Sequence, residues 1–470
     1  MKYKYVVLTN TTIGSFMSQL DSNIVLISLP TIIRELPGTT TFDALWVIMG
    51  YMLVTATLLL TFGRLADIFG RIRLYNLGFA VFTIGSGLCS IAPNGTTLVL
   101  FRLVQGVGGA LIFSNNAAIL TDAFPPTERG KAIGINLVLG VSGAVIGLVA
   151  GGVLTGLLGW RSIFWINLIP GIFATVWAYA RLKELATIQR DRLDPIGNTL
   201  FAVGLSIFLL GMTLGAISGY TIADVAMMVA GLVMIVGFVI AEMKVQSPMM
   251  DVTLFKIRAF SAGMVSNFLA SIARGAVLLL LVFYFQGARL LDALTAGILL
   301  IPFSIAFVSV GPLSGYLSDR YGARAFSTGG LLVSAVAFVW FATMPADIPY
   351  NIFVLPMILA GIGGGMFVAP NISSIMNASP VARRGIASGM SSTMITSGFL
   401  LSLGVAFVIM AASMPLSTLQ AIFAGLPVAA NEINVVLFMD AMHRIFLLMA
   451  VISLIAAIPS SMRGPKYVHH

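Results

Sequence analysis

The sequence predicts an all-α membrane protein with fourteen transmembrane helices. Apolar residues make up 58% of its 470 positions and charged residues only 9%, a composition that a water-soluble fold could not keep dispersed. The apolar runs reach the roughly 20 residues that a helix needs to cross a bilayer, and they are too long for the strands of a barrel. Lipid is therefore the solvent of this chain.

The apolar runs, read between charged or Pro- and Gly-rich breaks, give the helices in order. The first six predicted spans are 6–29, 43–62, 73–92, 96–121, 131–158 and 162–181. Two more follow at 195–217 and 224–242, and the last six are 259–285, 293–316, 325–343, 350–377, 385–412 and 442–462.

The basic residues predict the orientation of these spans. With both termini in the cytoplasm, twenty of the 26 Lys and Arg residues fall in inner loops or at the chain ends and four in outer loops, while Arg102 and Arg274 lie inside the membrane. The positive-inside rule favours this orientation. Topology and anionic lipid headgroups thus account for the net charge of +9, and no nucleic-acid partner is expected.

An internal repeat predicts two related halves. The segment GRLADIFGRIRL at 63–74 matches GYLSDRYGARAF at 315–326, an offset of 252 residues, which suits six helices plus two extra ones. We expect a six-helix half at 1–190, an inserted transmembrane hairpin at 191–250 and a second six-helix half at 251–470. Such halves rock to expose a site near the bilayer midplane alternately to each side.

Several motifs carry a family resemblance along nearly the whole chain. They are LDSNIVLISLP at 20–30, GRLADIFGRIRL at 63–74, RLVQGVGGA at 102–110, the fifth-helix glycines Gly134, Gly143, Gly147, Gly151 and Gly152, GWRSIFWINLIPG at 159–171, and Asp-Pro-Ile-Gly at 194–197. Together they resemble the fourteen-helix drug:proton antiporters of the major facilitator superfamily. The resemblance implies the major facilitator fold and proton-coupled export of small amphipathic compounds by alternating access, in a prokaryotic cell membrane.

The chain departs from that pattern at two motif positions. Leu148 stands where the fifth-helix motif has proline, and Ile68 stands where the loop motif prefers a basic residue, which Arg320 supplies in the second copy. The first departure keeps open an uncoupled facilitator of the same fold. The second predicts a weaker cytoplasmic charge contact in the first half.

Asp21 is the candidate proton-binding residue. An ionisable side chain inside a membrane costs about 2.5–3.5 kcal/mol on insertion scales, so its presence indicates a function. Helical spacing puts Asn10, Gly14, Met17 and Ser18 on the same face, and we expect this polar stripe to face a cavity. Asp21 would bind a proton or a cationic group; the alternative is a structural hydrogen bond to a neighbouring helix.

Arg102 is the second candidate for proton coupling, a role that the resemblance implies. Its charge must be matched inside the membrane by a carboxylate, a backbone carbonyl or an anionic substrate, and Asp21 is one candidate partner. The alternative is an arginine that only holds helices together.

Arg274 lies in the ninth span on one face with Asn267 and Ser271, where the family does not usually have a basic residue. Two buried arginines against one central carboxylate predict an excess of positive charge, which would suit a substrate with a carboxylate or phosphate. The alternatives are an arginine that extends outward and one that is solvated by cavity water.

We assign further residues to the substrate cavity, to the gating loops and to helix packing. With Asp21, Met17 and Arg274, the predicted cavity contains Asn115, Asn116, Asn136, Asn267 and Asn371, although interhelical hydrogen bonds would explain these amides equally well. The resemblance assigns gating to Gly63, Asp67, Gly70, Arg71, Asp319 and Arg320, where both aspartates are expected to cap the following helices. The small-residue spacing of Gly143, Gly147, Gly151 and Gly152 predicts close helix packing.

The remaining composition predicts that the protein has no disulfide, metal site or cofactor. One cysteine, Cys89, and three histidines predict no disulfide, no metal site and no cofactor. The sequence has no phosphate-binding loop, so we do not expect the protein to use ATP. It also has no set of catalytic residues that would support the remote alternatives, a membrane enzyme or a receptor. The expected partners are a small-molecule substrate, protons and the lipid bilayer, with the monomer as the functional unit.

Overall fold

A computed structural model describes residues 2–185, 194–245, 248–380, 383–427 and 432–463. Fourteen of its helical segments are long and apolar enough to cross a membrane, which confirms the predicted number. Each predicted span overlaps one of them. The last observed span begins nine residues earlier than predicted, at Ile433 instead of 442, because the apolar residues at 435–439, which precede Asp440, belong to the same helix.

Six long helices make a first bundle. They are α1 (Tyr3–Glu35), α2 (Thr41–Phe69), α3 (Arg71–Ser90), α4 (Gly95–Ala123), α5 (Pro126–Leu158) and α6 (Ser162–Arg181). In this bundle α1 packs along α5, α3 lies between α4 and α6, and α4 also packs on α2.

A second bundle follows a helical hairpin. The hairpin consists of α7 (Pro195–Ser218) and α8 (Ile222–Glu242), and α7 packs on α2 and on α15 of the second bundle. The second bundle contains η1 (Val252–Lys256), α9 (Arg258–Arg274), α10 (Val277–Phe283), η2 (Tyr284–Ala288), α11 (Ala293–Leu299), α12 (Ile301–Tyr321), α13 (Ala323–Phe341), α14 (Tyr350–Ala378), α15 (Arg384–Ser413), α16 (Leu416–Ala424) and α17 (Glu432–Ser461). The predicted boundaries near 190 and 250 stay a prediction.

Two spans of the second bundle are interrupted, and the sequence did not predict the breaks. The ninth span divides into α9, α10 and the π-helical turn η2, and the tenth divides into α11 and α12. The first break falls at Gly275, where a Cβ would lie 2.8 Å from the Phe399 Cα of α15. The Ser402 hydroxyl of α15 accepts the Ala276 N–H at 3.0 Å, so the broken backbone is satisfied by a neighbouring helix.

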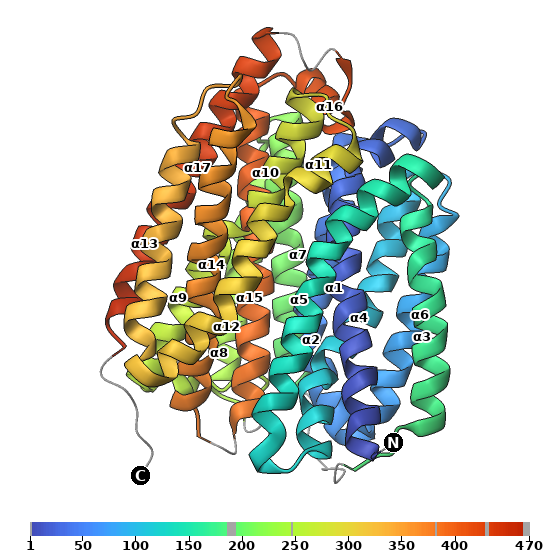
Figure 1. The fold of residues 1–470 in the computed structure, drawn as a ribbon, viewed down its shortest axis with the longest axis vertical. Coiled ribbons are helices and arrows are strands. Elements are labelled where there is room, and N and C mark those ends of the chain that lie inside the picture. The colour runs from blue at the N-terminus through green and yellow to red at the C-terminus, as the bar shows by residue number, and fades with distance from the viewer. Residues whose placement is uncertain (1, 186–193, 246–247, 381–382, 428–431, 464–470) are drawn as a thin grey trace.

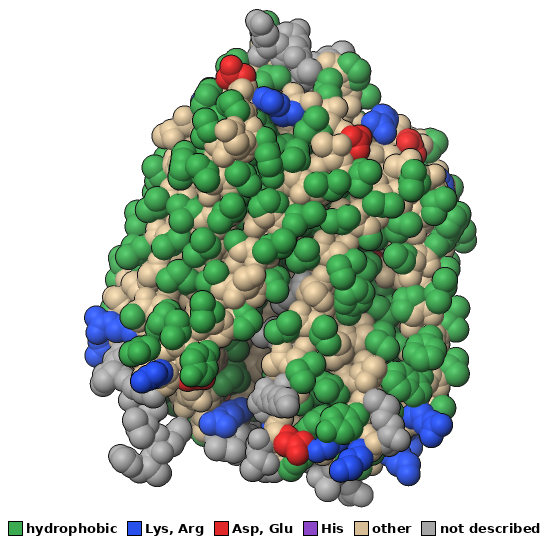
Figure 2. All heavy atoms as spheres, in the orientation of Figure 1, with side chains coloured by type: hydrophobic (Ala, Val, Ile, Leu, Met, Phe, Trp, Pro, Cys, Tyr) green, Lys and Arg blue, Asp and Glu red, His purple; other side chains and the backbone are tan. Residues whose placement is uncertain are grey.

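The surface has the charge pattern of a protein that crosses a bilayer. Figure 2 shows apolar side chains over most of the visible face, with Lys and Arg gathered at the lower end, where Figure 1 places the start of α1. This pattern agrees with the predicted orientation, although a cytoplasmic location of the termini stays a prediction.

The two bundles touch closely at the upper end, opposite the start of α1 (Figure 1). A Cβ at Gly152 of α5 would lie 2.5 Å from Ala293 O, and one at Gly297 of α11 would lie 2.5 Å from Leu148 O. The Gln286 amide donates to Ile27 O at 2.7 Å, which ties η2 to α1. Between the bundles the surface is hollowed in its lower half (Figure 2), so the structure is closed at the upper end.

The fifth-helix glycines serve two different contacts. A Cβ at Gly143, Gly147 or Gly151 would lie within 2.7 Å of α1, at Phe16 O, Leu20 O and the Ile27 side chain respectively. These three glycines therefore let α5 pack against α1 inside the first bundle. Gly152 instead faces the second bundle, as the preceding contacts show.

We predict that Gly152→Leu opens the upper end. The leucine side chain would overlap Ala293, and overpacking of about 1–3 kcal/mol would shift the closed-to-open ratio by roughly 5- to 150-fold. Spin labels on Glu35→Cys and Asp347→Cys, in the two bundles, should show a longer distance in this variant.

The matched control is Gly156→Leu, four residues further along α5, because nothing lies within 4 Å of a Cβ at Gly156. If both substitutions leave the distance distribution unchanged, Gly152 does not control closure.

Candidate functional site

A buried ion pair lies at the centre of the first bundle. The Asp21 side chain is 0% exposed and that of Arg102 is 1% exposed, and Arg102 Nη1 donates to Asp21 Oδ2 at 2.6 Å. Asp21 Oδ1 accepts two more hydrogen bonds, from Gln105 Nε2 at 2.9 Å and from Asn167 Nδ2 at 2.8 Å. All three partners donate, so the carboxylate serves only as an acceptor here.

Arg102 has further partners on α2 and α4. Its Nε donates to Val47 O at 3.0 Å, and its Nη1 also reaches the Gln105 side-chain oxygen. Its guanidinium carbon lies 4.4 Å from the centroid of the Tyr51 ring, in cation–π geometry. Of the candidate partners of Arg102, the structure shows a carboxylate, Asp21, and a backbone carbonyl, Val47 O, whereas a role of the pair in proton coupling stays a prediction.

Two glycines of the fourth-helix motif bring the network together. A Cβ at Gly106 would lie 2.9 Å from Tyr51 O of α2, and one at Gly108 would lie 2.3 Å from Phe82 N of α3. Only glycine permits such close backbone approach. Helix α4 therefore packs closely between α2 and α3. This position directs the Arg102 side chain toward the Asp21 carboxylate on α1.

Asn167 is the residue that sequence reasoning missed. It is 1% exposed and lies on α6, inside the motif at 159–171 that supported the resemblance. Its only signal was an amide in the middle of an otherwise apolar helix. Ser86 of α3, which accepts from Gln105 Nε2 at 2.6 Å, was also missed.

The prediction that the polar stripe of α1 faces a cavity is wrong for most of its members. Asn10, Gly14, Ser18 and Asp21 are all buried inside the first bundle. The Asn10 amide donates to Ala174 O of α6 at 3.3 Å, and a Cβ at Gly14 would lie 2.7 Å from the Tyr75 hydroxyl. The stripe packs on α3, α4 and α6 because those helices cover α1.

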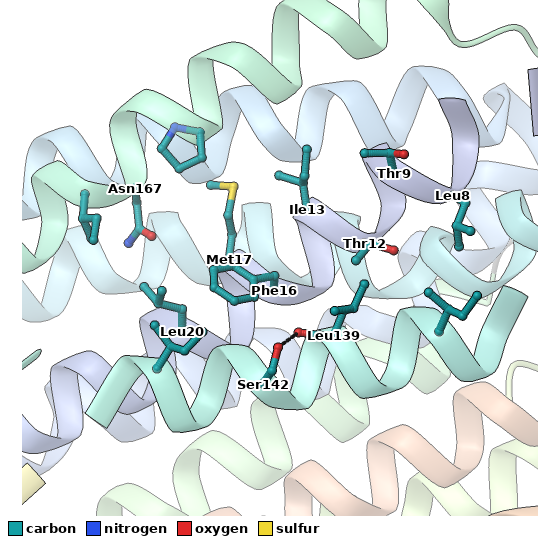
Figure 3. Close-up of a pocket in the computed structure, with 14 residues that line it drawn as sticks. Leu8, Thr9, Thr12, Ile13, Phe16, Met17, Leu20, Leu139, Ser142 and Asn167 are labelled. Atoms are coloured by element: carbon teal, nitrogen blue, oxygen red, sulfur yellow. Dashed lines mark hydrogen bonds between the residues drawn. The ribbon is translucent and has the colours of Figure 1, made fainter. Parts of the chain in front are cut away.

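Met17 differs from the rest of the stripe, since it lines a pocket on the side of the first bundle. This side pocket has a volume of about 610 Å³ and is formed by α1, α5 and α6 (Figure 3). It runs along α1 from Leu8 to Leu20, and Asn167 lies at the Leu20 end. Its lining residues are Leu8, Thr9, Thr12, Ile13, Phe16, Met17, Leu20, Ile135, Leu139, Ser142, Ile146, Ile166, Asn167 and Pro170.

The amides of the first bundle, which we assigned to the substrate cavity, form local or interhelical hydrogen bonds. Asn116 donates to Thr11 O at 2.7 Å, and Asn136 accepts from the Ser15 hydroxyl at 3.0 Å, so both join their helices to α1. Asn115 donates within α4, to Leu111 O at 2.8 Å. The alternative of structural hydrogen bonds therefore describes these three residues.

Two amides of the second bundle are also engaged between elements. Asn267 donates to the Ser391 hydroxyl at 3.0 Å and joins α9 to α15. Asn371 accepts a hydrogen bond from Arg463. Burial of Arg463 lowers its pKa to about 10. A substrate contact of either amide stays a prediction.

Arg274 lies at the break between α9 and α10 and is half-buried. Its guanidinium carbon is 5.5 Å from the centroid of the Phe399 ring, and its Nε atom is buried without a hydrogen-bond partner. Among the described residues no carboxylate forms an ion pair with it. The expected excess of positive charge is thus located at this break.

The two loop motifs form matching turns. Gly70 joins α2 to α3 with a φ of +103°, and Gly322 joins α12 to α13 with a φ of +92°, a region that side chains other than glycine rarely adopt. Gly63 lies within α2, with nothing inside 4 Å of a Cβ, and Arg320 is exposed beside the Tyr321 ring. Their gating role stays a prediction.

The expected capping role of the motif aspartates is wrong. Asp67 lies in the last turn of α2 and binds Arg71 at 2.8 Å, and Arg71 also binds Asp122 of α4 at 2.8 Å. The cap of α3 is instead Glu184, which accepts the Ile72 N–H at 2.9 Å. Asp319 likewise lies in the last turn of its own helix, α12.

Comparison with known proteins gives consistent matches along the chain. The family described as the Major Facilitator Superfamily matches residues 11–247 and 263–465. The riboflavin transporter RibZ of Clostridioides difficile is 34% identical over 87% of this chain and 88% of its own length. The multidrug resistance protein Stp of Mycobacterium tuberculosis is 32% identical over 81% of this chain and 71% of its own.

Solved structures share the fold at low sequence identity. A bacterial homologue of the human lysosomal transporter Spinster, in an inward-facing and unoccupied conformation, superposes with a TM-score of 0.69 and 17% identity, over 98% of this chain and 97% of that one. An auto-inhibited peptide transporter of the POT family gives 0.71 and 16%, over 100% and 98%.

We predict strong coupling between the two charges of the network. Asp21→Asn would leave Arg102 buried without a counter-ion, and breaking a buried pair in this way costs about 3–5 kcal/mol. Arg102→Gln should cost a similar amount, whereas the double variant should cost clearly less than the sum. Unfolding of the purified protein in detergent measures all three, and additive losses would contradict the pairing.

Proposed function

The chain belongs to the major facilitator superfamily, and we propose that it exports small amphipathic compounds from the cell in exchange for protons. Its family and relatives are those of transporters rather than enzymes, and the protein is a multi-pass plasma membrane transporter. The observation that carries the proposal is the buried Asp21–Arg102 pair.

Protonation of Asp21 would change the forces that hold α1. The ionised carboxylate accepts hydrogen bonds from α4 and α6, so it ties three helices together. A neutral carboxyl loses the attraction to Arg102, which keeps only Val47 O, Gln105 and the Tyr51 ring. Adding a proton therefore weakens the contact of α1 with α4 and α6, and removing it restores that contact.

This change can be linked to alternating access because α1 also forms part of the closed upper end. Ile27, which lies six residues after Asp21, accepts a hydrogen bond at its carbonyl oxygen from Gln286 of the second bundle. Helix α1 thus joins the ion pair to the closure. In the proposed cycle the protein opens inward and binds substrate with Asp21 ionised; after outward opening, a proton replaces the substrate.

The relatives support the substrate class. Two proteins that cover most of the chain are named as a riboflavin transporter and a multidrug resistance protein. Export of amphipathic compounds with a flat or flexible apolar body is compatible with both names. The plentiful Met and Phe residues, 24 and 31 in number, suit adaptable apolar contacts.

We predict that Asp21→Asn abolishes substrate-driven proton movement. Purified protein in liposomes with an internal pH dye would be given riboflavin, ethidium or tetraphenylphosphonium, and the wild type should change the internal pH with at least one of them. Asp224→Asn is the control, because that carboxylate lies in the capping box of α8, where it accepts from Thr221, and asparagine keeps an acceptor oxygen at this position. Normal proton movement in Asp21→Asn would overturn the proposal.

A second candidate, transport of an organic anion, rests on Arg274. Its charge has no carboxylate partner among the described residues, and it lies at a helix break whose backbone is within reach of α15. A substrate carboxylate or phosphate would supply the missing negative charge.

We predict a clear test of this candidate with carboxyfluorescein. If the protein carries anions, liposomes with the wild type should take up the dye, Arg274→Ala should not, and Arg274→Lys should retain part of the activity because it keeps the charge. If wild type moves lipophilic cations with protons and leaves carboxyfluorescein outside, the anion candidate is wrong.

A further inference from the structure

The side pocket has the size and the chemistry of a binding site for a small molecule. A volume of about 610 Å³ falls within the range of known ligand pockets. Its fourteen lining residues are all uncharged, and ten of them are apolar. Leu139 and Ile146 of α5 are 44% and 47% exposed on the outside of the bundle, so the pocket opens toward the surrounding lipid.

One polar atom of the pocket has no partner. A carboxylate only accepts hydrogen bonds, so the Asn167 amide must turn its Nδ2 toward Asp21. This leaves Asn167 Oδ1 on the pocket side, and no described residue donates to it. The side-chain hydroxyls of Thr9 and Ser142 already donate to the carbonyls of Tyr5 and Leu139.

The unpartnered acceptor distinguishes between possible occupants. A lipid acyl chain would fill the apolar part of the pocket but cannot donate a hydrogen bond, so Asn167 Oδ1 would stay unsatisfied. An amphipathic molecule with an apolar body and an N–H or O–H group satisfies both parts. Because no lining residue is charged, recognition would depend on shape and on this one donor.

We propose that the side pocket binds an amphipathic compound that donates a hydrogen bond to Asn167 Oδ1, and that Asn167 transmits its binding to Asp21. The inference rests on the proposed function, because the bound compound would be the exported substrate. Asn167 acts here as a positioning residue: one side of its amide contacts the ligand and the other holds the carboxylate.

The amide gives the coupling a definite sign. A donor that binds Oδ1 polarises the amide, and the Nδ2–H bond to Asp21 strengthens, since hydrogen bonds in a chain reinforce one another. A stronger donor favours the ionised carboxylate and opposes its proton. By reciprocity, protonation of Asp21 weakens ligand binding. Mutual exclusion of substrate and proton is what exchange transport requires.

The test measures equilibrium binding, so it does not depend on transport. Ethidium, which has two aromatic amino groups, is titrated by fluorescence against purified protein in lipid nanodiscs, and tetraphenylphosphonium, which has no donor, serves as a competitor. Ile166→Trp fills the pocket from α6 and should weaken ethidium binding by about tenfold or more. Ile169→Trp, on the same helix but 79% exposed and outside the pocket, should change binding less than about twofold.

Two further variants complete the test. Ser142→Phe fills the same pocket from α5, which keeps the proposal testable if Ile166→Trp fails to fold. Ethidium affinity should fall on acidification in the wild type and become independent of pH in Asp21→Asn. Tetraphenylphosphonium should compete weakly, without that pH dependence.

The contrary outcomes are distinct from those of the transport assay. Absence of ethidium binding, equal effects of Ile166→Trp and Ile169→Trp, or unchanged pH dependence in Asp21→Asn would overturn the inference. If native mass spectrometry finds a phospholipid that only the pocket-filling variants lose, while ethidium binding is unchanged, the pocket is a lipid site. Proton-coupled transport could persist in each of these cases.

Discussion

A carboxylate and a guanidinium can stay inside a membrane protein only if each compensates the charge of the other and their remaining hydrogen-bonding groups are satisfied. The Asp21–Arg102 pair meets this condition with partners from α1, α2, α4 and α6. The glycines of α4 bring the helices close enough for these bonds. The charge pair thus joins four helices of the first bundle.

The pair is placed between two features that a transporter must connect. On one side, α1 continues to Ile27, where it binds the second bundle at the closed end. On the other side, Asn167 separates Asp21 from the side pocket. The closed end, the proposed proton site and the side pocket are therefore linked through one helix and one amide. This arrangement gives a physical reason why the occupancy of one could alter the others.

The sequence predicted the helices and the intramembrane charges better than the directions in which side chains point. Spans follow from the length of apolar runs, and Asp21 and Arg102 were conspicuous because charge inside lipid is costly. Helices that are apolar on every side carry little periodicity, however, so the covered face of α1 was assigned to a cavity. Asn167 was missed for the same reason, since one amide does not indicate its partner. The break at Gly275 depends on contacts with α15, which no local pattern encodes. The break at Leu300 precedes Pro302, whose missing N–H is a local signal that the reading of apolar runs did not use.

The most direct test of this account is the protonation state of Asp21 itself. Infrared difference spectra of the purified protein in lipid, recorded while the pH is lowered, should show the band of a protonated carboxyl that disappears in Asp21→Asn and persists in Asp224→Asn. The same band should decrease when ethidium is added at fixed pH. If no carboxyl band depends on Asp21 while the protein stays folded, the ion pair only holds the helices together and the coupling described above is wrong.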